Sequence, residues 1–347
     1  MDPSVYIPAY LERTYLASHP ELTDAARELV HNDVSVNPHK YAQTEHAQAL
    51  LSYAGVHRHL LDELHRIEDM GSDEEFEQTR NRLFDDMRDE LLKIVRVDAL
   101  AVDAQLLAII LADTPVDACL GDLMKLEATT ADYLQQSVPG FDIEAPHYWA
   151  NNVLADGVTA ADLTVSEPAL IGWLHTLEAI SQLCMASARY RAAANYARRV
   201  LKAEGYPTRA AGTVLLALAR LEDEDGFFAL AHQLEEEIGA DALENSPWYL
   251  LARTILLFKT NKMRPATRAL REFANRCEGG AFFLLNPMYQ TPYLPCRPEP
   301  RDPWDLSHQA VWEADGIISD TPDFAPWANA CEDVSQLAQE FARRYGF

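Results

Sequence analysis

A group of four histidines falls on one long helix that the sequence predicts between residues 41 and 69, and these side chains are the best placed for chemistry. The histidines and their acidic neighbours are His46, His57, His59, His65, Glu45, Asp62 and Glu63. A metal site needs ligands that converge on one point, and a helix supplies them at spacings of three or four residues. His59 has that spacing to Asp62 and Glu63. A metal-dependent enzyme built on this histidine-rich helix is therefore one hypothesis.

The sequence does not complete such a site. No H-E-x-x-H motif adds further metal ligands. The chain also has no G-x-S-x-G, P-loop or G-x-G-x-x-G motif. Neighbouring carboxylates such as Asp85 and Asp86 point in different directions on a helix. We therefore expect no catalytic residues, no cofactor and no metal, with the histidines on a polar face or in a groove.

The elements that would position any site form a repeat. From Pro168 to Leu285 the chain shows three times an apolar helix, a polar turn and an amphipathic helix, with a period of about 35 residues, close to that of tetratricopeptide repeats. In the third repeat the spacing W-x2-L-G-x2-Y is reproduced by Trp248, Leu251, Ala252 and Ile255. Such repeats stack into a solenoid with an extended concave face. The predicted fold is an all-α, tetratricopeptide-like superhelix of antiparallel helix pairs.

The other two repeats follow the same plan. In the first, Leu177, Ile180, Ser181 and Cys184 take the first-helix positions. In the middle repeat we predict a first helix over residues 210–221, a turn over 222–226 and a second helix over 227–238. Aligning the three first helices on small side chains makes Ser181, Ala217 and Ala252 equivalent. The second helices show apolar stripes at spacings of four and three.

Composition limits the classes of function. The 347 residues carry 54 acidic and 29 basic side chains, a formal net charge of −25, so a nucleic-acid partner is not expected. Five cysteines lie far apart without C-x2-C, which is typical of a reducing compartment. The longest wholly apolar run, Leu106 to Ala112, is too short to span a bilayer, and no signal peptide opens the chain. We expect a cytoplasmic protein without a membrane segment.

We divide the chain into three segments. Residues 1–96 form N-terminal helices with an acidic hairpin, in which Ser72 and Glu75 make a capping box. Residues 97–285 hold the tetratricopeptide-like repeats, entered after a weakly patterned stretch between 139 and 167. Residues 286–347 contain a proline-rich segment and two capping helices, predicted over 306–318 and 325–345. Strand-like patterns occur only at Asp33–Val36 and Asn286–Leu294.

Two stretches resemble the suppression of tumorigenicity 7 family of helical-repeat proteins. The first, similar to the pattern D-P-x-x-x-D-A-x-x-L-L-A … P-x-x-A, consists of Val97-Asp98, Asp103 to Ala108 and Pro115 to Ala118, with Ala99 where the family usually has proline. The second consists of Ala281 to Pro295, Glu313-Ala314 and Pro326-Trp327. The resemblance covers roughly residues 95 to 330. It implies tetratricopeptide-like folding and no catalytic motif.

These observations favour a non-catalytic scaffold that binds a protein or peptide on the concave face. The first-helix residues predicted to face that groove are His175, Glu178, Gln182, Tyr249 and Arg253. Polar and aromatic side chains of this kind suit an extended peptide. The proline-rich segment could itself occupy the groove. The alternatives are the metal-dependent enzyme described above and a structural protein that forms homo-oligomers through uncapped repeats.

Overall fold

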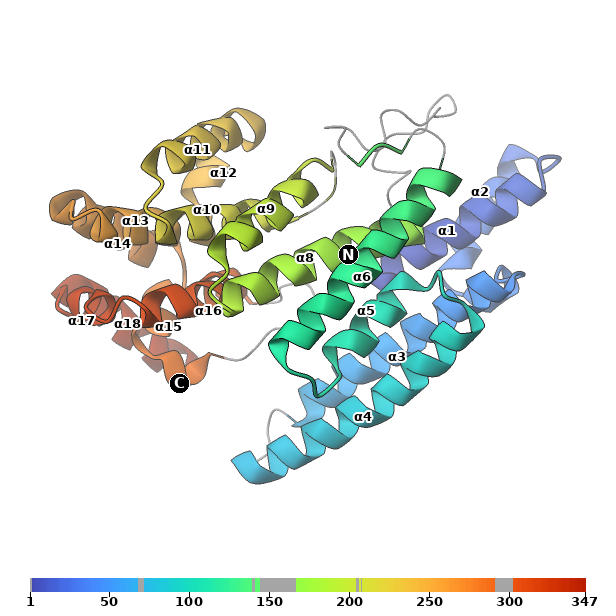
Figure 1. Ribbon diagram of the computed structural model, residues 1–347, viewed down its shortest axis with the longest axis horizontal. Helices are drawn as coiled ribbons and strands as arrows, with labels where there is room; N and C mark the ends of the chain where they lie inside the picture. Colours follow the sequence, from blue (N-terminus) through green and yellow to red (C-terminus); the bar gives the residue numbers. More distant parts are fainter. Residues whose placement is uncertain are drawn as a thin grey trace. The chain divides into compact units, whose positions relative to one another are not determined.

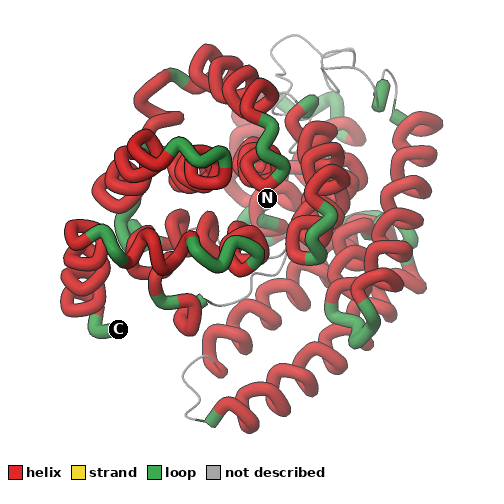
Figure 2. Tube along the Cα trace, turned by 60° about the vertical axis from the view of Figure 1, so that its left-hand side comes forward, coloured by secondary structure: helices red, strands yellow, loops and turns green. Residues whose placement is uncertain are grey.

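The computed structural model describes residues 2–67, 72–138, 141–143, 167–203, 206, 208–290 and 302–347 (Figure 1). Regular structure in these residues is entirely helical, with seventeen α-helices, two short 3-10 helices and no strand (Figure 2). The all-α prediction is confirmed. The strand-like pattern at Asp33–Val36 instead falls on the end of a helix and the following turn. The second one begins with the 3-10 helix Pro287–Tyr289, and its remainder after Gln290 lies outside the described residues.

The chain contacts divide the molecule into two compact units. Unit 1 comprises residues 1–179, 202–207 and 294–298, and unit 2 comprises 180–201, 208–293 and 299–347. Helix α8 (Pro168–Ala186) begins in unit 1 and ends in unit 2. The predicted boundary stretch between residues 139 and 167, and the proline-rich residues 291–301, lie outside the described residues except at 141–143 and 167.

Unit 1 is built around a long helical hairpin. Its helices are α1 (Pro3–Ser18), α2 (Asp24–Val34), α3 (Glu45–Ile67), α4 (Asp73–Val97), α5 (Val102–Ile110) and α6 (Val116–Ser137), with a 3-10 turn at Pro38–Lys40 and the first part of α8. Helix α3 pairs with α4, which also packs against α5 (Figure 1). Fully buried side chains such as Ile7, Leu60 and Leu91 form its core.

Two helix starts in unit 1 test the sequence signals. Ser72 is the N-cap of α4, and its hydroxyl accepts a hydrogen bond from the Glu75 backbone N–H at 3.5 Å, so the predicted cap is confirmed. Helix α6 begins differently, because Pro115 is its N-cap residue and no side chain caps the helix. The backbone N–H of Thr114 is used instead in a turn to the Ala112 carbonyl.

Unit 2 contains the end of α8, its partner helix α9, two further helical hairpins and a helical C-terminal region. Its helices after α8 are α9 (Tyr190–Leu201), α10 (Ala210–Arg220), α11 (Glu224–Ile238), α12 (Ala240–Glu244), α13 (Pro247–Lys259), α14 (Met263–Arg276), α15 (Gly280–Leu285), α16 (Asp305–Ser319), α17 (Phe324–Asn329) and α18 (Glu332–Tyr345). The hairpins are α8–α9, α10–α11 and α13–α14. Helix α10 packs against both α9 and α13, so neighbouring hairpins share a core (Figure 1).

The three hairpins turn in the same way. Two residues after the end of each first helix, a residue other than glycine has a left-handed backbone. These residues are Ala188, Glu222 and Asn261, with φ angles of 60°, 59° and 58°. The next backbone N–H then bonds a carbonyl five residues earlier, as in a Schellman turn. The three bonds join Arg189 to Cys184 at 2.7 Å, Asp223 to Leu218 at 3.1 Å and Lys262 to Leu257 at 2.8 Å.

These turns give the register of the repeats. The fifth, ninth and twelfth residues after each left-handed position are buried. They are Ala193, Ala197 and Val200, then Phe227, Ala231 and Leu234, then Ala266, Leu270 and Phe273. Seven residues before the turn stand Ser181, Leu215 and Thr254, all buried. The alignment of Ser181 with Ala217 and Ala252 is therefore wrong in register. The turns lie 34 and then 39 residues apart because the five residues of α12 are inserted in the second interval.

The C-terminal helices do not form a simple pair. The second helix predicted over 325–345 is interrupted after Asn329, and α17 and α18 are separate. The Ser335 hydroxyl donates to the Asn329 carbonyl at 2.7 Å where the two helices meet. Helix α18 packs against α14 and α15. Helix α16 packs along α10 and α13, the first helices of the middle and third hairpins.

Candidate functional site

Two of the predicted groove residues belong to a buried polar cluster in unit 1. His175 of α8 approaches Asp103 of α5 through its Nδ1, 2.9 Å from Oδ1. The hydroxyl of Tyr6 donates to the other oxygen of Asp103 at 2.5 Å. One turn along α8, Glu178 accepts a hydrogen bond from the Tyr206 hydroxyl at 3.2 Å. The rings of Tyr6 and Tyr206 both lie near the His175 imidazole. The cluster therefore ties α1, α5 and α8 together.

The electrostatics of this cluster favour an ionised Asp103 between neutral phenols. Burial alone would raise the pKa of the Asp103 carboxyl, but the nearby charge of His175 and the hydrogen bonds from His175 and Tyr6 outweigh it and lower the pKa. Burial, with the charge of Asp103, raises the pKa of Tyr6 well above its usual value. Burial and Glu178 do the same to the pKa of Tyr206. With side chains 12% and 5% exposed, His175 and Asp103 form an internal network.

The other predicted residues lie in unit 2. Tyr249 of α13 stacks on Phe227 of α11, with ring centroids 6.0 Å apart. Arg253 forms an ion pair with Glu272 of α14 at 3.1 Å, and its guanidinium lies 6.0 Å from the centroid of the Tyr249 ring. These two side chains therefore lie together on the side of α13 that faces the second helices. Gln182 is half-buried on α8. His175 and Glu178 thus belong to one cluster in unit 1, whereas Tyr249 and Arg253 lie together in unit 2.

The opposite side of the first helices carries α16. Three polar contacts join α10 to α16. Arg209 donates to Gln309 at 2.5 Å, Thr213 to Glu313 at 3.4 Å and Arg220 to Asp320 at 3.4 Å. Each contact joins residues 100 positions apart, so α10 and α16 are parallel and in register. We call the side of α10 and α13 that contacts α16 the inner face.

Trp248 connects three helices at this inner face. Its indole N–H donates to Glu313 at 2.9 Å, and the Arg209 guanidinium lies 5.9 Å from its ring centroid. The ring packs so closely on Gly212 of α10 that a β-carbon there would lie 2.3 Å from its Cγ. The Tyr190 hydroxyl adds a bond to Asp320 at 3.3 Å. Sequence analysis used Trp248 only as a mark of the repeat.

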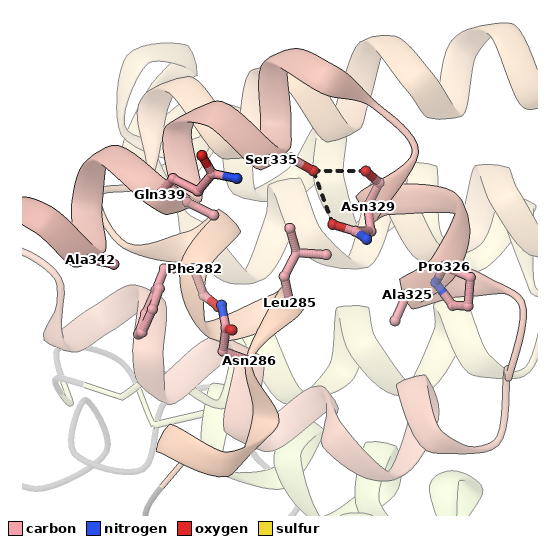
Figure 3. Close-up of a pocket in the computed structure, with 10 residues that line it drawn as sticks. Phe282, Leu285, Asn286, Ala325, Pro326, Asn329, Ser335, Gln339 and Ala342 are labelled. Carbon is pink, nitrogen blue, oxygen red and sulfur yellow. Dashed lines mark hydrogen bonds between the residues drawn. The ribbon is translucent and has the colours of Figure 1, made fainter. Parts of the chain in front are cut away.

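A pocket opens between α15, α17 and α18 (Figure 3). Its volume is about 620 Å³, within the size range of ligand pockets. The lining residues are Phe282, Leu285, Asn286, Ala325, Pro326, Asn329, Ser335, Ala338, Gln339 and Ala342. None of these side chains is charged. Sequence analysis missed the pocket, because small, apolar and amide side chains show no motif.

The polar groups of the pocket are partly fixed. The Asn329 side-chain oxygen accepts a hydrogen bond from Ser335 at 3.0 Å, so its amide nitrogen remains a donor. Asn286 donates to the Phe282 carbonyl at 2.8 Å, which anchors its side chain to α15. Figure 3 shows the amides of Asn286 and Gln339 directed toward the space around Leu285. The pocket thus combines an apolar floor with amide donors and acceptors.

The histidine-rich helix does not gather its side chains at one point. His57 is buried, His59 and His65 are exposed, and His46 bonds to Asp98 of the loop after α4. Among the described residues, no group of three or more His, Cys, Asp or Glu side chains is arranged to hold a metal ion. Within the same part of the chain, no helix has the length and apolar character needed to cross a lipid bilayer.

Comparisons with known proteins add no relative to this description. No protein-family model, curated protein or solved structure matches the chain. Function is therefore inferred from the surfaces and polar groups of the two units.

Proposed function

We propose that the protein is a non-catalytic, tetratricopeptide-like scaffold that binds a peptide segment of a partner, as its resemblance to the suppression of tumorigenicity 7 family implies. Three helical hairpins with one turn geometry and a shared core support a repeat scaffold. The observation that carries the binding function is the uncharged pocket between α15, α17 and α18.

The lining chemistry suits an extended peptide with apolar side chains. The apolar floor formed by Phe282, Leu285 and Ala338 can take one or two such side chains. The amides of Asn329 and Gln339 can bond the peptide backbone, which offers one donor and one acceptor per residue. The Asn329 amide is already held by Ser335, so its loss of side-chain freedom on binding is limited.

The charge around the pocket points to basic residues in the partner. Asp323 directly precedes α17, and Glu332 lies in the first turn of α18, one turn before Ser335. Both side chains are exposed next to the uncharged lining. The whole chain carries a net charge of −25. The favoured ligand is an extended segment with apolar residues at its centre and Lys or Arg on its flanks.

The five residues predicted for the groove are less available for this function. His175 and Glu178 are engaged in the buried cluster. Arg253 is paired with Glu272, although its surface together with Tyr249 remains a second candidate for peptide binding. The inner face of the first helices is covered by α16. The pocket is therefore the surface on which the proposal rests.

Two substitutions on one helix test the pocket. Peptides selected from a random library on the full-length protein are titrated against Gln339→Trp, which fills the pocket, and Gln336→Trp. Gln336 is exposed on α18 but does not line the pocket, so it is the matched control. We expect binding to be lost with Gln339→Trp and kept with Gln336→Trp.

A third variant, Tyr249→Ala with Arg253→Glu, tests the second surface. Binding that is lost only in this variant would move the peptide site from the pocket to α13. Equal binding by all three variants would contradict both sites. Failure of the wild-type protein to select any peptide would contradict the scaffold function itself.

A further inference from the structure

Helix α16 meets the inner face as a ligand helix would. Consecutive helices of a hairpin are antiparallel, whereas α16 is parallel to α10 and in register with it over three turns. The contacts fall at Arg209, Thr213 and Arg220, with spacings of four and seven residues. Such spacings keep contact positions on one side of a helix in parallel coiled coils. The inner face therefore recognises a helix side by side along its length.

The chemistry of this contact is polar at each of its three positions. Arg209 bonds an amide, Thr213 and Trp248 share the Glu313 carboxylate, and Arg220 contacts a carboxylate. Between these three contact positions, α16 buries a narrow stripe of apolar side chains. This stripe consists of Ala310, Val311, Ala314 and Ile317.

The position of Asp320 shows that the inner face selects for acidic groups. Asp320 is the C-cap residue of α16, where the partial negative charge of the helix end opposes a carboxylate. Its contacts with Arg220 and Tyr190 account for a carboxylate at this place. Arg220 in turn is held over the Tyr190 ring, with its guanidinium 5.2 Å from the ring centroid.

Arg220 is not fully satisfied by α16. One of its terminal nitrogens reaches Asp320 at 3.4 Å, but its buried Nε has no hydrogen-bond partner among the described residues. A buried donor without a partner is destabilising, and a guanidinium can bind a carboxylate with two parallel bonds. A glutamate in place of Asp320 has the longer side chain needed to approach both nitrogens. This end of the inner face is therefore suited to a ligand helix with a longer carboxylate side chain at the place of Asp320.

We propose that the inner face of α10 and α13 is a binding site for an acidic amphipathic helix of a partner protein, and that α16 is its internal competitor. The partner helix carries carboxylates at the places of Glu313 and Asp320, seven positions apart, which face Thr213 and Arg220 on the receiving helix. This site is separate from the pocket of α15, α17 and α18, and it does not depend on the peptide ligand proposed there.

The test uses the full-length protein and a fluorescent peptide spanning residues 303–321 with Asp320→Glu. In the protein, Glu313→Gln removes the charge that holds α16 without changing its shape. We expect the peptide to bind this variant at least about tenfold more tightly than the wild-type protein. The same peptide with Glu313→Gln should bind neither protein, and Arg220→Ala in the protein should remove the advantage of Glu over Asp at position 320.

Further measurements keep the test decisive. Circular dichroism checks that Glu313→Gln stays folded, and Asp320→Asn, at an exposed position, replaces it if it does not. Equal binding of the charged and uncharged peptides, or no binding to either weakened variant, would overturn the proposal. Dimers of the weakened protein without peptide binding would assign the face to a second copy and overturn it too. Gln339→Trp should leave binding of the helix peptide unchanged, which separates this site from the pocket.

Discussion

Trp248 donates its indole N–H to Glu313 at 2.9 Å while its ring covers Gly212. One side chain thus joins α13 to α16 and sets how closely α13 approaches α10. The tryptophan that identifies the repeat in the sequence therefore also connects helices of unit 2 that lie far apart in the sequence.

The close approach at Gly212 predicts that even one methyl group is destabilising. Gly212→Ala places a β-carbon 2.3 Å from Trp248, so α10 and α13 must separate, and we expect a loss of about 1–3 kcal/mol in the free energy of unfolding. Gly316→Ala is the control in the same unit, because the nearest atoms are 3.8 Å or more away. It should be neutral or slightly stabilising through helix propensity. Urea unfolding measures both, and equal midpoints would contradict the packing described.

At the left-handed turn residues, by contrast, a substitution to glycine should raise the stability of the protein. Ala188 has a φ of 60°, which costs a β-carbon-bearing residue about 1 kcal/mol, so Ala188→Gly should stabilise unit 2. Asn261→Gly should gain less, because asparagine tolerates this conformation. Ala186→Gly, in the last turn of α8, should instead destabilise. Thermal unfolding of the three variants gives the order, and a loss of stability in Ala188→Gly would refute the turn geometry.

Replacing the buried Asp103 carboxylate of unit 1 by an amide should strongly lower the stability of the protein. Asp103→Asn removes the carboxylate between His175 and Tyr6, and loss of one partner of a buried pair costs about 3–5 kcal/mol. Asp122→Asn breaks only the exposed ion pair with Lys125 and should change stability by less than about 1 kcal/mol. Denaturant titration at neutral pH compares the two. Similar small effects would mean that Asp103 is not the anchor of the cluster.

The pKa of Asp103 gives this effect a pH dependence. The folded-state pKa is lowered, so the unfolded protein takes up the proton first as the pH falls. The stabilisation is therefore complete above the ordinary carboxyl pKa of about 4 and is lost as the pH falls through the lower folded-state value. The difference between wild type and Asp103→Asn should shrink as the pH falls below about 4. A difference that grows on acidification would contradict the sign.

The phenols of the same cluster predict loss of stability in alkali. Tyr6 and Tyr206 have pKa values well above 10, so the unfolded chain loses these protons first as the pH rises. Their stabilisation is complete below about pH 10 and declines above it. The double variant Tyr6→Phe, Tyr206→Phe should lose less stability above pH 10 than the wild type, whereas Tyr289→Phe, at an exposed tyrosine, should not differ from it. Unfolding midpoints across this range check the order.

Local patterns in the sequence predict most of the helices. The apolar stripes gave the second helices of the hairpins, and Ser72 marked the start of α4. The five-residue helix α12 was missed, because it spans little more than one turn and shows no periodicity. The tetratricopeptide-like superhelix, the three-segment division and the peptide-binding role of the predicted residues remain predictions.

The site could be predicted only where its partners are near in sequence. His175 was placed in a groove because nothing local shows that its partner Asp103 lies 72 residues earlier. Helix α16 covers the inner face through contacts between residues 100 positions apart in the sequence. The periodicity of a single helix cannot predict such contacts. The pocket uses Asn, Gln and Ser, whose types are common on any surface. In each case the missing information is a non-local contact.

The register of α16 with α10 has a consequence for how unit 2 folds. A linear array of repeats can form from either end, and its repeats can melt one at a time. Here α16, near the end of the chain, packs against the first helices of the middle and third hairpins through contacts between residues 100 positions apart. Closing so long a loop slows folding and makes it depend on non-local contacts. During synthesis the hairpins are made before α16, and their packing is complete only once α16 has been added. We therefore expect unit 2 to unfold cooperatively, in a single transition.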